Sequence, residues 1–94
     1  MKEVVTRWDP VDHLHTEASQ IAYLNACLVE DPGDGSLVRA ALGDIARARG
    51  MTTVSRAAGI SREGLYRALA SDGNPEFATV MRVLHALGIQ LRVA

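Results

Sequence analysis

Residues 51–69 constrain the fold of this chain more than any other stretch, because small and apolar residues recur there at helical spacing. Gly59 interrupts the pattern, and a glycine adopts the left-handed backbone of a tight turn without a Cβ penalty. Ser61 is placed to cap the helix that follows it. The stretch predicts two short helices, one ending near Ala58 and one over residues 62–70. Their inward positions are Val54, Ala57, Ala58, Ile60, Leu65, Ala68 and Leu69.

This pattern is typical of a helix-turn-helix that reads DNA. Its second helix must present a polar, unobstructed face to the major groove. The alternative is that two short helices joined by glycine are only part of a helical bundle. The polar and charged residues predicted to contact bases or the DNA backbone are Thr52, Thr53, Ser55, Arg56, Ser61, Arg62, Glu63, Tyr66 and Arg67.

The side-chain chemistry suggests a role for several of these residues. Arg62 and Arg67 have the planar fork that donates to guanine O6 and N7, or to phosphate alone. Glu63 either accepts from cytosine N4 or only favours the positive end of the helix. Tyr66 is suited to a thymine methyl group or a phosphate. Gly64 is costly within a helix, by about 1 kcal/mol relative to alanine. A close approach to DNA or to another helix would explain it, and helix packing is the preferred explanation.

Charge divides the chain near the same place. Residues 1–36 carry two basic and seven acidic side chains, a net charge of −5, whereas residues 37–94 carry eight arginines and four acidic side chains, a net charge of +4. Solvated helix faces would account for either half. The coincidence of the basic half with the predicted helix-turn-helix favours a nucleic-acid partner instead.

Composition limits the class of protein. Ninety-four residues suit a single domain, with 1–36 as an acidic N-terminal segment and 37–94 as the DNA-binding core. With 48% hydrophobic but only 4% aromatic residues, close-packed helices are favoured.

The single Cys27 allows no internal disulfide and fits a reducing compartment. No apolar run approaches the roughly 20 residues of a membrane helix, and the start lacks a signal-peptide core. We therefore expect a cytoplasmic protein without a membrane partner.

The remaining periodicity predicts a mainly all-α fold of about five helices with a short β-strand at each end. The expected helices are 17–30 capped by Thr16, 37–49 capped by Ser36, 52–58 capped by Thr52 or Thr53, 62–70, and one that starts at Asn74-Pro75. A short turn over 11–14 is expected after Asp9-Pro10, with Asp9 as its N-cap and Pro10 at the first helical position. The strands are expected at 4–8 and 89–93, where residues have β propensity or alternate. The predicted inward faces are Ile21, Leu24 and Leu28; Val38, Ala41, Leu42 and Ile45; and Phe77, Val80, Met81, Leu84 and Leu87.

Three runs of sequence carry a resemblance to a known family. They read ALGDIARARGM over 41–51, GISREGLYRAL over 59–69 and GNPEFAT over 73–79. With Trp8-Asp9-Pro10, His13-Leu14 and Thr16-Glu17, they resemble the HigA-like addiction-module antidote family, which has a λ-repressor/Cro-type (XRE) helix-turn-helix. Ser55 departs from that pattern, which usually has alanine there.

The resemblance spans nearly the whole chain and implies both fold and function. It implies a compact, λ-repressor-like helical domain, a homodimer, and the antitoxin half of a type II toxin–antitoxin pair. The implied partners are double-stranded operator DNA and a small basic toxin of the RelE/ParE superfamily (HigB-like). The antitoxin would neutralise this toxin and repress their shared operon.

The acidic first segment then has a possible partner, because a basic toxin is attracted to a negatively charged surface. Trp8 is a candidate aromatic anchor. The alternative is a solvated acidic helix with Trp8 packed on its own core. The candidate toxin-binding residues are Glu3, Trp8, Asp9, Asp12 and Glu17.

No catalytic or metal-binding pattern competes with these predictions. His13 and His15 lie about 200° apart on a helix, and no third ligand is nearby, so no metal is expected. Cys27 is expected to be a buried structural thiol. The sequence has no evident Ser, His and Asp arrangement of a catalytic triad and no phosphate-binding glycine loop. We therefore expect no cofactor and no enzymatic activity. The alternative function is a stand-alone regulator of the Cro or phage-repressor type, without a toxin partner.

Overall fold

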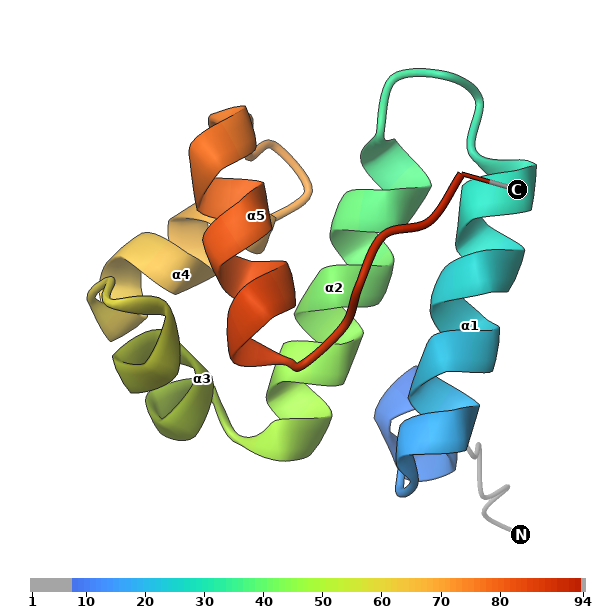
Figure 1. Cartoon of the computed structure of the whole chain (residues 1–94), viewed down its shortest axis with the longest axis horizontal. Helices are drawn as coiled ribbons and strands as arrows, with labels where there is room; N and C mark the ends of the chain where they lie inside the picture. Colours follow the sequence, from blue (N-terminus) through green and yellow to red (C-terminus); the bar gives the residue numbers. More distant parts are fainter. Residues whose placement is uncertain (1–7, 94) are drawn as a thin grey trace, which may run out of the picture.

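The computed structural model describes residues 8–93, and in that range it is almost entirely helical (Figure 1). A short 3-10 helix, η1, precedes five α-helices, which agrees with the predicted all-α class and helix number. The elements are η1 (Pro10–His13), α1 (Glu17–Glu30), α2 (Ser36–Arg49), α3 (Met51–Ala58), α4 (Arg62–Leu69) and α5 (Phe77–Ala86).

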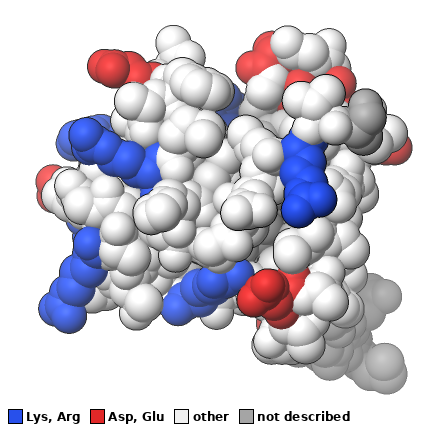
Figure 2. All heavy atoms as spheres, viewed as in Figure 1, with Lys and Arg blue, Asp and Glu red and all other residues white. Residues whose placement is uncertain are grey.

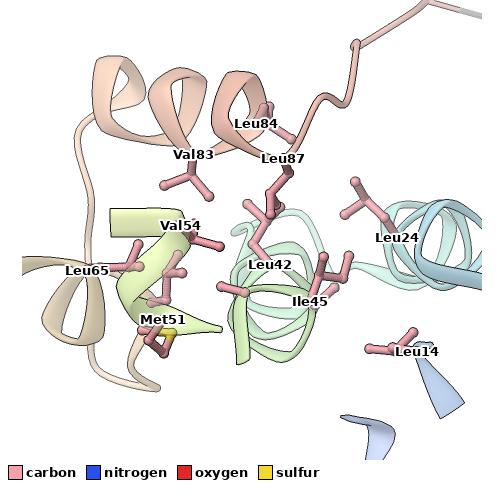
Figure 3. Packing of buried hydrophobic residues seen from close by; sticks show 13 residues of the cluster. Leu14, Leu24, Leu42, Ile45, Met51, Val54, Leu65, Val83, Leu84 and Leu87 are labelled. Atoms are coloured by element: carbon pink, nitrogen blue, oxygen red, sulfur yellow. The ribbon is translucent and has the colours of Figure 1, made fainter. Parts of the chain in front are cut away.

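Helix α2 lies at the centre of the hydrophobic core. Its residues Leu42 and Ile45 are completely or almost completely buried, as the periodicity predicted. Figure 3 shows them between two groups of apolar side chains. Leu14 and Leu24 come from the N-terminal side, and the other group comes from α3, α4 and α5, with Val54, Leu65 and Val83. The acidic segment and the basic half therefore share one core.

The predicted inward face of α1 is wrong in two of its three positions. Leu24 is buried, but the side chains of Ile21 and Leu28 are 39% and 44% exposed. The helix instead turns Gln20 and Leu24 towards α2, with Tyr23 and Cys27 partly buried against the core. A polar side chain can be buried there because its hydrogen bonds are satisfied. The Gln20 amide donates to the carbonyl of Leu14 (3.0 Å) and accepts from Arg49 Nε (2.7 Å).

The predicted face of α5 also needs correction. Phe77 and Met81 are 74% and 40% exposed, whereas Val83, absent from the predicted face, is completely buried. Leu84 and Leu87 are buried as predicted. Helix α5 packs mainly against α3, so its buried stripe is rotated towards Val83. Tertiary contact, rather than hydrophobicity, selects that stripe.

Three helix starts are capped as predicted. Asp9 accepts a hydrogen bond from the Val11 amide at the start of η1 (3.0 Å). Thr16 and Ser19 form a reciprocal capping box at α1. Ser61 accepts from the Gly64 amide at the start of α4 (2.9 Å).

The other three predicted caps are wrong. The N-cap residues of α2, α3 and α5 are Gly35, Gly50 and Glu76, and none of them makes a side-chain cap. At α2, Asp31 provides the capping oxygen from the preceding loop, accepting from the amides of Leu37 (2.9 Å) and Val38 (3.3 Å). This acceptor lies five residues before the helix, outside the usual capping pattern.

The predicted C-terminal strand does not form. Residues 89–93 have no regular secondary structure, and the tail runs from the end of α5 past α2 towards α1 (Figure 1). A strand needs a partner to complete its hydrogen-bond ladder, and the described residues offer none. Of the predicted strand at 4–8, residues 4–7 lie outside the described residues, and Trp8 is not in a strand.

Candidate nucleic-acid interface

Helices α3 and α4 are joined by the tight turn that the sequence predicted. Gly59 has a left-handed backbone, with φ of 71°, and ends α3. Its amide donates to the Arg56 carbonyl (3.2 Å), and the Ile60 amide donates to the Ser55 carbonyl (3.0 Å). Leu65 anchors α4 on the core without any exposed surface. The two helices are thus fixed relative to each other, and the opposite side of α4 faces solvent.

Eight of the nine predicted contact residues are exposed on α3, on α4 or at the turn between them. Ser55 is the exception, because it is only 4% exposed and its hydroxyl donates to the Thr52 carbonyl (3.0 Å). Serine at this position therefore satisfies a backbone acceptor inside the helix pair and is not available to a ligand. The exposed residues are Thr52, Thr53, Arg56, Ser61, Arg62, Glu63, Tyr66 and Arg67.

Arg62 is held by its neighbours. Its guanidinium donates to Thr52 Oγ1 (3.3 Å) and to the Tyr66 hydroxyl (3.4 Å), and it lies 5.6 Å from the centre of the Tyr66 ring. It therefore bridges the start of α3 and the outer face of α4. Arg56 and Arg67 form no ion pair with any described residue, so their guanidinium groups are available to an anionic partner.

The sequence did not identify the contact that fixes the end of α4. Arg39 of α2 donates to the carbonyls of Gly73 (2.9 Å) and Ser71 (2.7 Å), in the loop that follows the helix. A Cβ on Gly73 would lie 2.6 Å from the Arg67 carbonyl and closer still to that of Ala68. The loop can approach α4 this closely only because residue 73 is a glycine.

The candidate toxin-binding residues lie at the other end of the molecule. Trp8 is 66% exposed and stacks on His13, with ring centres 5.2 Å apart. The alternative in which Trp8 packs on its own core is therefore wrong. Asp12 and Glu17 are exposed and Glu3 lies outside the described residues. Asp9 Oδ1 is 3.6 Å from Arg47 Nη2, a loose and exposed ion pair.

The two charge regions are only partly separate in space, because Arg47 of the basic half lies 3.6 Å from Asp9 of the acidic segment. On the face shown in Figure 2, basic side chains are spread over the half formed by α3, α4 and α5, although some acidic ones occur there as well. Acidic side chains also lie over both ends of α1, although a basic side chain lies between them on the same half of this face. Within residues 8–93, no three His, Cys, Asp or Glu side chains are grouped so that they could hold a metal ion. None of the described helices is long and apolar enough to cross a membrane.

These features define a small helical protein with a polar two-helix surface and a separate acidic segment. A family model described as a probable addiction module antidote protein matches residues 4–94. The chain belongs to this family, which confirms the resemblance at the level of the antidote. Membership indicates an antitoxin with a cognate toxin partner, and a regulatory protein rather than an enzyme.

The chain is also similar to a curated protein over nearly its whole length. An uncharacterized protein of Haemophilus influenzae is 52% identical over 93 residues. The match covers 99% of this chain and 94% of the relative. No solved structure matches the chain significantly.

Proposed function

We propose that this protein is the antitoxin of a type II module, which neutralises a HigB-like toxin of the RelE/ParE superfamily and represses its own operon. The observation that carries the DNA-binding part is the exposed face of α4, where Glu63, Tyr66 and Arg67 point away from a helix anchored by Leu65. Family membership supports the antitoxin part. We treat residues 1–94 as one domain, because the acidic segment and the basic half share a core.

In this proposal the α3–α4 pair is an XRE-type helix-turn-helix in a λ-repressor-like domain, and α4 lies in the major groove. Arg67 and Glu63 are placed for base edges. Thr52, Thr53 and Arg56, at the solvent-facing side of α3, are placed for phosphates. Arg62 is already oriented by Thr52 and Tyr66, so less side-chain entropy is lost when it meets a phosphate or a guanine.

The toxin-binding part of the proposal uses the other end of the molecule. The segment 1–36 has a net charge of −5, and Trp8 offers an exposed aromatic anchor beside Asp12 and Glu17. A basic toxin would be drawn to this surface by charge and held by the indole. Because the two proposed surfaces lie on opposite sides of the molecule (Figure 1), both partners can bind together.

Operator binding is tested with Arg67→Ala and DNA from upstream of the protein's own gene. If Arg67 reads a base, we expect the variant to lose about 1–3 kcal/mol of specific binding and little affinity for random DNA. Equal loss on both DNAs would make Arg67 a phosphate contact. The matched control is Arg82→Ala, which removes the same charge from α5. If wild-type protein binds the upstream DNA no better than random DNA, the repressor proposal fails.

Toxin binding is tested by co-expression with the neighbouring reading frame, followed by pull-down with Trp8→Ala and Asp12→Lys variants. Deleting residues 1–36 would be a poor test, because Leu14 and Leu24 belong to the core. We expect the surface variants to fold normally and to lose toxin. A chain that binds its operator but has no protein partner would support the alternative, a stand-alone regulator of the Cro type.

A further inference from the structure

The tail over residues 89–93 has the side-chain pattern of a strand but no strand to pair with among the described residues. Ile89 is partly buried, while Leu91 is 50% exposed and Val93 fully exposed. Gln90 and Arg92 alternate with them and are exposed too. Of the tail's backbone, only the Ile89 amide has a described backbone partner, the Leu84 carbonyl (2.9 Å). An open, alternating edge of this kind favours pairing with another chain.

A groove lies beside this edge. It has a volume of about 440 Å³ and is lined by residues of α1 on one side and by residues 88–92 on the other. Its α1 wall includes Ile21 and Leu28, the two apolar residues that the sequence predicted to be inside and that the structure leaves exposed. The groove therefore combines an unpaired backbone edge with an apolar wall, the two features that an added strand requires.

We propose that the tail pairs antiparallel with the same segment of a second copy, about a two-fold axis at Leu91. The strand of the second copy then lies in the groove against Ile21 and Leu28. This interface would form the homodimer that the family resemblance implies, and it is inferred from the tail and the groove alone.

The tail sequence is self-complementary in this register. With the axis at Leu91, Ile89 faces Val93 of the second copy, Leu91 faces Leu91, and Gln90 faces Arg92. Each apolar residue then meets an apolar residue, and no like charges are opposed. An axis at Arg92 would place two arginines opposite each other. An axis at Gln90 would place Val93 opposite Leu87, which ends α5. With the axis at Leu91, each of the five tail residues therefore lies opposite a tail residue of the second copy.

A second copy also suits the groove better than a toxin does. Among the described residues that line the groove, the one charged side chain is the basic Arg92, and a basic toxin is attracted instead to Asp12 and Glu17, before and at the start of α1. An isologous interface needs one self-complementary patch, and the tail supplies it. Binding of a toxin strand to the tail is an outcome that the experiment below separates.

Disulfide trapping tests both the partner and the register. In a Cys27→Ser background, Leu91→Cys should form a covalent dimer on mild oxidation, because the two positions face each other within disulfide range. Val93→Cys is the matched control. Its two copies would lie about 13 Å apart, four residues along the strand, beyond the roughly 7 Å limit for a disulfide. Mixing Ile89→Cys with Val93→Cys protein should restore cross-linking between the two chains.

A pair of charge variants tests the interface without cysteines. Gln90→Glu places a carboxylate opposite each Arg92 of the pair, and Gln90→Lys places a like charge there. By sedimentation equilibrium, we expect the dimer Kd to tighten about fivefold in the first variant and to weaken about fivefold in the second. Both substitutions are exposed, so circular dichroism should show unchanged folding.

Three results would overturn the proposal. They are a wild-type protein that stays monomeric at 100 µM, equal cross-linking by Leu91→Cys and Val93→Cys, or Gln90 variants that leave the dimer Kd unchanged. Gln90 variants that alter toxin binding but not self-association would assign the edge to the toxin. These self-association experiments are done without DNA or toxin. A negative result would therefore reject the dimer interface without bearing on operator binding or toxin binding.

Discussion

The hydroxyl of Tyr23 on α1 donates a 2.6 Å hydrogen bond to the Asp44 carboxylate on α2. The second oxygen of Asp44 accepts from Arg47 (2.7 Å), which also faces Asp9. One carboxylate therefore connects the acidic segment to the central helix of the core. Neither Tyr23 nor Asp44 was predicted to matter, because the two lie 21 residues apart in the chain.

Tyr23→Phe should destabilise the fold by about 1 kcal/mol. The substitution keeps the ring and removes the donor, so it leaves a partly buried carboxylate with one hydrogen bond fewer. Urea unfolding followed by circular dichroism would measure the loss. Tyr66→Phe is the control, because its exposed hydroxyl makes only a long contact with Arg62 (3.4 Å). Equal effects of the two substitutions would show that the Tyr23 bond adds nothing.

The same bond predicts a pH dependence at the alkaline end. Burial and the hydrogen bond to Asp44 raise the pKa of Tyr23 above its ordinary value of 10.0. The unfolded chain releases this proton first, so the stabilisation is complete below pH 10 and is lost as the pH rises further. Free energies of unfolding measured between pH 8 and 11 should fall above pH 10. The fall should be smaller in Tyr23→Phe.

Cys27 must be replaced before the decrease in the free energy of unfolding at alkaline pH can be assigned to Tyr23. Burial and the charge of Asp44 raise the pKa of its thiol as well, which adds a similar loss above pH 9. The comparison is therefore made in a Cys27→Ser background. An unchanged alkaline slope in Cys27→Ser/Tyr23→Phe would rule out Tyr23 as its source.

Asp31→Asn should make the fold less stable and less sensitive to acid. Asp31 accepts four backbone hydrogen bonds, from Gly33, Gly35, Leu37 and Val38. Although desolvation opposes it, these bonds lower the pKa of Asp31 below 3.8. Its stabilisation is thus present above pH 3.8 and is lost as the pH falls through the lowered pKa. Thermal unfolding at pH 7 and at pH 3 should show a smaller difference in the variant than in wild type. Asp12→Asn, on an exposed surface, is the control.

Gly73→Ala should be more damaging than Gly43→Ala. A Cβ at residue 73 would meet the backbone carbonyls of Arg67 and Ala68, so the loop that Arg39 holds would have to move. At residue 43 the nearest neighbour would be 3.5 Å away, an ordinary contact. Alanine is also favoured over glycine within α2 by about 1 kcal/mol. We expect Gly43→Ala to be neutral or stabilising by urea unfolding. If Gly73→Ala is equally well tolerated, the closeness of this loop does not limit stability.

Local signals in the sequence predicted most of the helices and some of their caps. Ser61 and Thr16 use side chains within three residues of the amides they cap, so the pattern is visible in a short window. Most exposed residues of α3 and α4 were predicted for the same reason, because helical periodicity sets which residues face outward. Ala57, predicted to face inward, is exposed instead. Ser55 was misassigned because its polarity is satisfied by a backbone carbonyl within its own helix.

The sequence by itself determined the helical class, the turn at Gly59 and the separation of acidic from basic residues, because these depend on residue type and on spacing along one chain. The tertiary structure decided which stripe of α1 and α5 is buried and how Arg39 holds the carbonyls of Ser71 and Gly73. It also left residues 89–93 unpaired beside an apolar groove. These outcomes depend on which partner each surface meets across the fold, and that choice is made by contacts between residues far apart in the sequence.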